Sequence, residues 1–133
     1  MPAPLEKEIA ELIERIDQHP DKLHGDHTPA VGRLIEIGRP ALGRVLELML
    51  NENRDTRLRA LRVIETVTMG LAGFRLGQGW SSAADERTWR DQWSAMGSLT
   101  ADAPMTKRAE SVAKWRQWLG AHPPAGPVEG ANP

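Results

Sequence analysis

Potential metal ligands are concentrated in one short stretch of the chain, residues 19–27 (HPDKLHGDH). Histidine and carboxylate side chains together can form the first coordination shell of zinc or of a redox metal. The stretch also contains Pro20 and Gly25, which mark a loop in which histidine and aspartate are common for turn and capping reasons. The spacing does not require the side chains to converge, so we predict no metal site. The side chains that would form one are His19, His24 and His27, with Asp21 and Asp26 beside them.

Groups for covalent or acid–base catalysis are scarce. The chain has no cysteine and no tyrosine, which excludes disulfides, thiolate chemistry and cysteine-ligated zinc. Its serines fall at expected helix caps or on helix surfaces, and their spacing to the histidines does not suggest a catalytic triad. We therefore expect a non-enzymatic protein without a cofactor. The serines concerned are Ser81, Ser82, Ser94, Ser98 and Ser111.

The composition is that of an ordinary soluble domain. Hydrophobic residues make up 40% and charged residues 26% of the 133 residues, a length that usually forms one domain with its own core. The net charge of −1 argues against a dedicated polyanion binder. No segment has the roughly eighteen consecutive apolar residues of a membrane span, and the acidic, amphipathic N-terminus is unlike a signal peptide. We expect a cytoplasmic protein that does not bind membranes.

Residues 28–77 are the part of the chain around which the rest is organised. Thr28 is suited to cap a helix that Gly38 then ends, because a Thr–Pro pair favours a helix start and glycine a helix end. A second helix begins at Pro40. Its apolar residues fall on one face at helical spacing. They are Leu42, Val45, Leu46, Met49 and Leu50.

A third helix follows a turn over residues 51–54, and Asp55 is placed to cap it. Two helices joined by so short a turn form an antiparallel hairpin. On the third helix, Arg59, Arg62 and Glu65 are expected to point away from its apolar side. That apolar side consists of Leu61, Ile64, Val67, Thr68 and Leu71.

The run LIEIGRPALGRVLELML, followed by NENRDTRLRALRVIETV, resembles a HEAT or HEAT-like (PBS lyase-type) helical repeat. The resemblance covers residues 28–76. Leu34, Gly38, Pro40, Ala41, Leu46 and Leu50 match the first run of the repeat, and Asp55, Arg59 and Ile64 match the second. Ala60 comes one place earlier than the usual small residue. The resemblance implies an α-solenoid used mainly to bind proteins, although some members bind nucleic acid or are enzymes. It carries no catalytic residue to this chain.

Glycines weaken the end of the third helix. Between residues 70 and 79 there are four, and each costs a helix roughly 1 kcal/mol relative to alanine. Either another helix packs closely over Gly70 and Gly73 and the helix continues, or it breaks near them. We favour close packing, which places the end of the helix at residues 77–79.

The N-terminal residues 4–18 are expected to form a helix that caps one end of the stack. Its apolar stripe could instead lie in a groove of a second copy of the chain. The stripe consists of Leu5, Ile9, Leu12, Ile13 and Ile16.

Tryptophans dominate residues 80–120, where we expect two antiparallel helices, over residues 83–96 and from Pro104 onward. One interpretation makes the tryptophans core residues, with Trp80 and Trp118 partly exposed. The other makes them an exposed aromatic face beside arginines, suited to bind a peptide or to stack on bases. The residues 121–133 that follow are rich in proline and glycine, which predicts a flexible tail.

These patterns predict a single all-α domain over residues 1–120: a short α-solenoid-like, HEAT-like stack of antiparallel helix pairs with about five or six helices. The predicted function is protein binding or scaffolding, including self-association. Its predicted contacts are Arg59, Arg62, Glu65 and Trp80. The partner itself is not defined by the sequence.

Two alternatives stay open. One is nucleic-acid binding by the arginine-rich helix at residues 54–75, which the eighteen acidic residues and a pI near 6.4 disfavour. The other is a structural subunit of a homo-oligomer, in which the N-terminal apolar stripe would be buried between chains.

Overall fold

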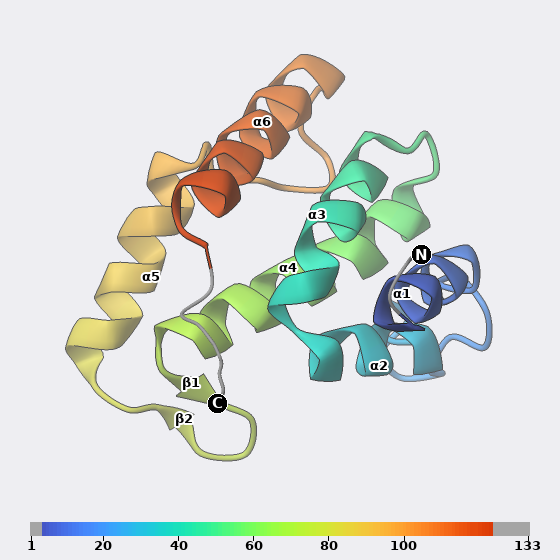
Figure 1. The fold of residues 1–133 in the computed structure, drawn as a ribbon, viewed down its shortest axis with the longest axis horizontal. Coiled ribbons are helices and arrows are strands. Elements are labelled where there is room, and N and C mark those ends of the chain that lie inside the picture. The colour runs from blue at the N-terminus through green and yellow to red at the C-terminus, as the bar shows by residue number, and fades with distance from the viewer. Residues whose placement is uncertain (1–3, 124–133) are drawn as a thin grey trace.

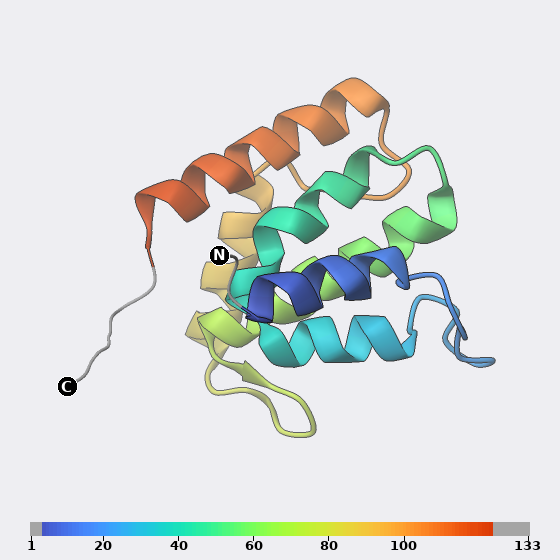
Figure 2. The same ribbon diagram turned by 45° about the vertical axis from the view of Figure 1, so that its right-hand side comes forward.

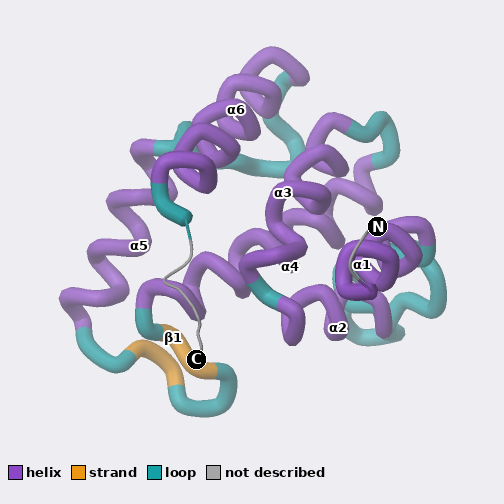
Figure 3. Tube along the Cα trace, in the orientation of Figure 1, coloured by secondary structure: helices purple, strands orange, loops and turns teal. Residues whose placement is uncertain are grey.

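The computed structural model describes residues 4–123, and these are predominantly helical (Figure 1). The all-α class predicted from the sequence is confirmed, with one small antiparallel β-hairpin that was not predicted (Figure 3). Within the described residues, no helix is long and apolar enough to cross a membrane. The elements are α1 (Pro4–Glu14), α2 (Pro29–Ile37), α3 (Arg39–Glu47), the 3-10 helix η1 (Leu48–Leu50), α4 (Arg54–Ala72), β1 (Phe74–Arg75), β2 (Gly79–Trp80), α5 (Ala83–Ala95) and α6 (Met105–Ala121).

The start and end of α2 follow the predicted capping chemistry. The hydroxyl of Thr28 accepts a hydrogen bond from the Val31 amide and donates one to the Ile16 carbonyl. Gly38 has a φ of 78°, a conformation that favours glycine, and its amide bonds to the Leu34 carbonyl. The chain can therefore end α2 and begin α3 at one residue.

Both ends of α4 differ from the prediction. Asn53, not Asp55, caps the helix, because its side chain accepts the Thr56 amide while Asp55 already lies in the first turn. The helix stops at Ala72, because Gly73 adopts a left-handed φ of 117°. The predicted continuation to residues 77–79 is therefore wrong.

No described helix packs closely over Gly70 of α4, whereas Gly73 at the end of the helix lies against the side chains of Ser81 and of Asp85 in α5. A Cβ atom built at Gly70 would meet nothing within 4 Å, so this glycine lies against open space. After Gly73 the chain turns into the β1–β2 hairpin, in which Phe74 pairs with Trp80. The hairpin returns the chain to α4, where the Ser81 amide bonds to the Gly73 carbonyl.

The contacts between helices arrange them in two rows (Figure 2). In one row α3 packs against α1 on one side and α6 on the other; in the second, α4 packs against α2 and α5. The rows are joined where α1 meets α2 and where α3 meets α4. In Figure 1, α5 and α6 lie on the side of the α3–α4 pair away from α1 and α2.

The sequence led us to expect that α5 and α6 pack along each other as antiparallel neighbours. The structure differs from this expectation. Instead α5 packs on α4, whereas α6 packs on α3 and η1. The loop between them is anchored by buried Leu99 and Ala101 and carries the chain from one row to the other. An opening is therefore left between the two helices.

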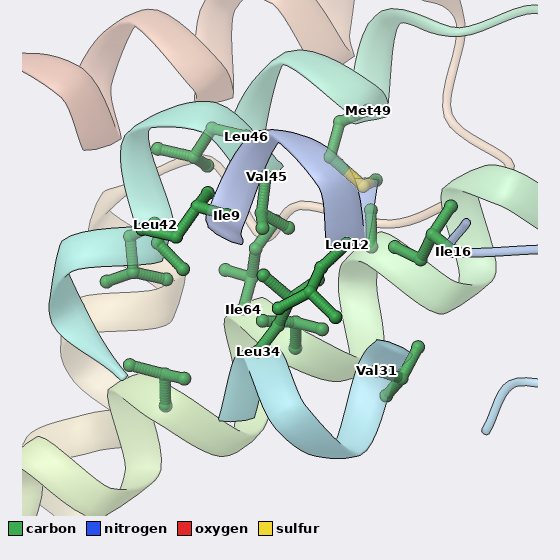
Figure 4. Packing of buried hydrophobic residues seen from close by; sticks show 14 of the residues in the cluster. Ile9, Leu12, Ile16, Val31, Leu34, Leu42, Val45, Leu46, Met49 and Ile64 are labelled. Atoms are coloured by element: carbon green, nitrogen blue, oxygen red, sulfur yellow. The ribbon is translucent and has the colours of Figure 1, made fainter. Parts of the chain in front are cut away.

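Most of the core lies among α1 to α4, where their apolar stripes meet (Figure 4), and Val112 and Trp115 of α6 extend it. The N-terminal stripe is part of it: Ile9, Leu12 and Ile16 are buried against residues of the same chain. The buried part of this stripe is therefore covered by other residues of the same molecule. Of the predicted tail, residues 124–133 lie outside the described part of the chain.

Candidate functional site

Two of the predicted contact residues, Arg59 and Arg62, hold the loop between α1 and α2 against α4. Arg59 pairs with Asp17 at 2.9 Å and donates to the Gly25 carbonyl at 3.0 Å. Arg62 pairs with Asp26 at 3.1 Å. Both guanidinium groups therefore have partners within the molecule, and their direct role is to fix this loop.

The other two predicted contacts, Glu65 and Trp80, are half-buried. Burial raises the pKa of Glu65, partly offset by the charge of Arg62. Trp80 belongs to the hairpin at the far end of α4, and the helix rises about 20 Å between Arg59 and Gly73. The four residues therefore do not form one surface.

The remaining arginines in the first half of α4 are also engaged within the chain. Arg54 pairs with Asp102 at 2.5 Å. Arg57 donates to the backbone carbonyls of Ala101, Asn51 and Glu52. The N-terminal half of this helix thus fastens neighbouring loops to the core.

The three histidines considered as metal ligands are not brought together. His24 lies 3.8 Å from Asp21 at an exposed position. The ring of His27 packs against Gly32, where an added Cβ would lie 3.3 Å from it. His19 is exposed and has a φ of 58°. Across residues 4–123, the structure has no group of three or more histidine, aspartate or glutamate side chains placed to hold a metal ion.

A continuous row of aromatic rings runs from the hairpin through α5 to the end of α6. Successive ring centroids are 4.9 to 5.9 Å apart. Trp89 and Trp115 are buried, whereas Trp80 and Trp118 are partly exposed, as predicted. The members in order are Phe74, Trp80, Trp89, Trp93, Trp115, Trp118 and His122.

An apolar cleft of about 580 Å³ opens where α5 and α6 diverge. A hollow of about 270 Å³ adjoins it, since Arg39 and Leu71 line both. Leu71 is 52% exposed, and Leu76, at the hairpin beside the hollow, is 72% exposed. We name the two together the α4–α6 cleft. Its lining residues are Ile35, Gly38, Arg39, Thr66, Val67, Thr68, Gly70, Leu71, Ala72, Phe74, Leu76, Thr88, Gln92, Trp118, His122 and Pro123.

Sequence reasoning missed this cleft because it assigned Leu71 to the core-facing side of a longer helix. The helix ends one residue later, and Leu71 is left exposed on the side of α4 that lines the cleft. The four closely spaced glycines were the signal available, since they also permit a break.

Arg39 is the cation of the cleft. Its guanidinium carbon lies 5.1 Å from the centroid of the Trp118 ring. Its Nη2 atom donates to the carbonyls of Leu119 and His122, which are neutral acceptors. Among the described residues, no carboxylate pairs with Arg39 and none lines the α4–α6 cleft. The cleft therefore combines apolar walls with the positive charge of Arg39, which no carboxylate within residues 4–123 neutralises.

The fold and this cleft define a small all-α domain with an open apolar site between helices. No protein-family model, curated protein or solved structure matches the chain.

Proposed function

We propose that this protein is a non-enzymatic protein-binding module and that the α4–α6 cleft receives a segment of its partner. The observation that carries the proposal is the exposure of Leu71 and Leu76 beside partly exposed Trp118. Large apolar side chains gathered in a concave site are typical of surfaces that bind another molecule. Tryptophan and arginine, both present here, are also the residues enriched at binding hot spots.

The proposal includes a HEAT-like architecture. The two rows formed by α1 with α3 and by α2 with α4 support stacked helix pairs. Four of the nine residues that match the repeat are buried packing residues: Leu34, Ala41, Leu46 and Ile64. The third pair departs from a regular stack, because α5 stays beside α4 and only α6 returns to the row of α3. This departure is what opens the cleft.

The observations favour protein binding over the two alternatives. A nucleic-acid-binding surface needs free basic groups for phosphates, whereas Arg54, Arg57, Arg59 and Arg62 are bound within the molecule. A homo-oligomer built on the N-terminal stripe needs that stripe exposed, and its central residues lie in the core.

Site-specific photo-crosslinking tests the proposal. The photoreactive residue p-benzoylphenylalanine is placed at Leu71 or at Leu76, with Leu23 as the control, because Leu23 is 87% exposed and does not line the cleft. We expect one polypeptide to be crosslinked in cells from both cleft positions and not from Leu23. Equal crosslinking at all three positions, or none, would contradict the proposal. A crosslink to a second copy, checked by light scattering, would make the chain its own partner.

A further inference from the structure

We infer that the α4–α6 cleft selects a polypeptide segment that is acidic as well as apolar, with a carboxylate bound by Arg39 and large apolar side chains on either side of it. The inference rests on the proposed function and names the chemistry of the partner. It follows from the shape of the site and from its charge.

The shape sets the apolar requirement. The cleft of about 580 Å³ and the hollow of about 270 Å³ meet at Arg39 and Leu71. A segment lying across this junction can place one large apolar side chain in each. Burying such side chains favours binding, although the costs of association offset part of the gain.

The charge sets the acidic requirement. Arg39 stands at the junction, and the carbonyls of Leu119 and His122 that it contacts do not neutralise it. Within residues 4–123, no acceptor is bonded to its Nε or Nη1 atoms. An arginine held in this way presents unused donors in a planar arrangement that suits a carboxylate.

The surroundings of Arg39 strengthen such a pair. The Trp118 ring covers the guanidinium, and the walls of the cleft are mostly apolar, so water is partly excluded. Charge pairs gain strength where the effective dielectric constant is low. A purely apolar or a basic segment would leave the charge of Arg39 without a counter-ion, which is the source of the selectivity.

The test is a selection of random short peptides displayed on phage. Binders are retained on the wild-type protein and discarded if they also bind Leu71→Asn, a neutral change that leaves the charge of the cleft unaltered. We expect the retained peptides to be enriched in aspartate or glutamate flanked by large apolar residues. Their affinity, measured by fluorescence anisotropy, should fall about tenfold in Arg39→Gln.

The matched control is Arg44→Gln, which removes the same charge from an exposed position of the same helix and should leave the affinity unchanged. Arg39 also supports the end of α6, so its variant could lose structure. The same interaction is therefore broken from the other side by changing the acidic residue of the peptide to its amide. With the wild-type protein, this change should also weaken binding about tenfold.

The possible results separate this inference from the proposed function. The acidic requirement would be overturned by peptides whose binding depends on Leu71 but that carry no acidic residue. It would also be overturned if changing the acidic residue of a peptide to its amide left the affinity unchanged. Either result would still support a protein-binding cleft. Failure to recover any peptide whose binding depends on Leu71 would count against both. Acid-dependent binding that is weakened equally by Arg44→Gln would assign the effect to net charge and overturn the role of Arg39.

Discussion

The indole N–H of Trp89 donates a hydrogen bond to the hydroxyl of Thr68, 2.9 Å away, where α5 packs on α4. Both side chains are buried, and the same hydroxyl donates to the Ile64 carbonyl. Thr68 therefore satisfies a buried polar group of another helix and helps to set the position of α5. One wall of the α4–α6 cleft depends on this position.

Removing the hydroxyl should destabilise the domain without creating a cavity. Thr68→Val keeps the side-chain shape but leaves the indole N–H buried without a partner, so we expect a loss of about 1 to 3 kcal/mol in the free energy of unfolding. Urea denaturation followed by tryptophan fluorescence measures it. The control Thr88→Val removes an exposed hydroxyl bonded within α5 and should change stability by less than about 0.5 kcal/mol. Equal losses in both variants would assign the effect to helix propensity.

Two glycines at the end of α4 should respond oppositely to alanine. Gly73→Ala places a Cβ on a residue with a φ of 117° and only 2.8 Å from Asp85 Oδ2 and Ser81 Oγ, so it should cost about 1 to 2 kcal/mol or more. Gly70→Ala adds a Cβ in open space within a helix and should stabilise by about 0.5 to 1 kcal/mol. Thermal unfolding of the two variants provides the measurement. A stabilised Gly73→Ala would mean that α4 can continue past its observed end.

Features encoded by neighbouring residues were predictable from the sequence. Thr28 and Gly38 bound a helix through their own backbone and side-chain chemistry, and both predictions are confirmed. The apolar stripe of α3 was also predictable. Helical spacing alone places Leu42, Val45 and Leu46 on one face, wherever the helix lies in the fold, and all three are buried.

Features that depend on distant residues were not predictable. The partners of Arg59 and Arg62 on the loop before α2 lie 42 and 36 positions earlier in the chain. A pattern of charges on one helix does not reveal whether such partners exist. The α4–α6 cleft is a stronger example, since it results from where α5 and α6 pack and not from any local pattern.

Arg108 is buried and should contribute to stability through its hydrogen bonds. It is 8% exposed, and its guanidinium donates to the carbonyls of Met49 at 2.5 Å and Ala103 at 2.9 Å. Burial and, to a smaller extent, the charge of Arg57 lower the pKa of Arg108. Because Arg108→Met leaves two carbonyls without their donor, we expect a net loss of about 2 kcal/mol in the free energy of unfolding. The exposed neighbour Lys107, changed to methionine, should alter it by less than about 0.5 kcal/mol. A more stable Arg108→Met would show that the cost of burying the charge outweighs its hydrogen bonds.

Glu65 should make the stability of the domain depend on pH in the opposite direction to a paired carboxylate. Burial raises the pKa of Glu65 in the folded state. The folded protein then holds this proton more tightly than the unfolded chain does, so ionisation of Glu65 lowers stability as the pH rises from the unfolded pKa through the raised one. Glu65→Gln cannot ionise. We therefore expect it to be more stable than wild type at neutral pH, with the difference vanishing once the pH falls below the unfolded pKa of about 4.3.

Glu8 provides the control of opposite sign. Arg33 holds its pKa below the usual range through a direct hydrogen bond of 2.7 Å. Ionised Glu8 therefore stabilises the fold above the unfolded pKa, and this contribution is lost as the pH falls toward the lowered value. Glu8→Gln should be less stable than wild type at neutral pH, and this difference should also shrink in acid. Melting temperatures of both variants and the wild type across this pH range measure the two effects. A Glu65→Gln variant that is destabilised at neutral pH, as Glu8→Gln is expected to be, would contradict this prediction and show that the attraction between Glu65 and the charge of Arg62 outweighs the cost of burial.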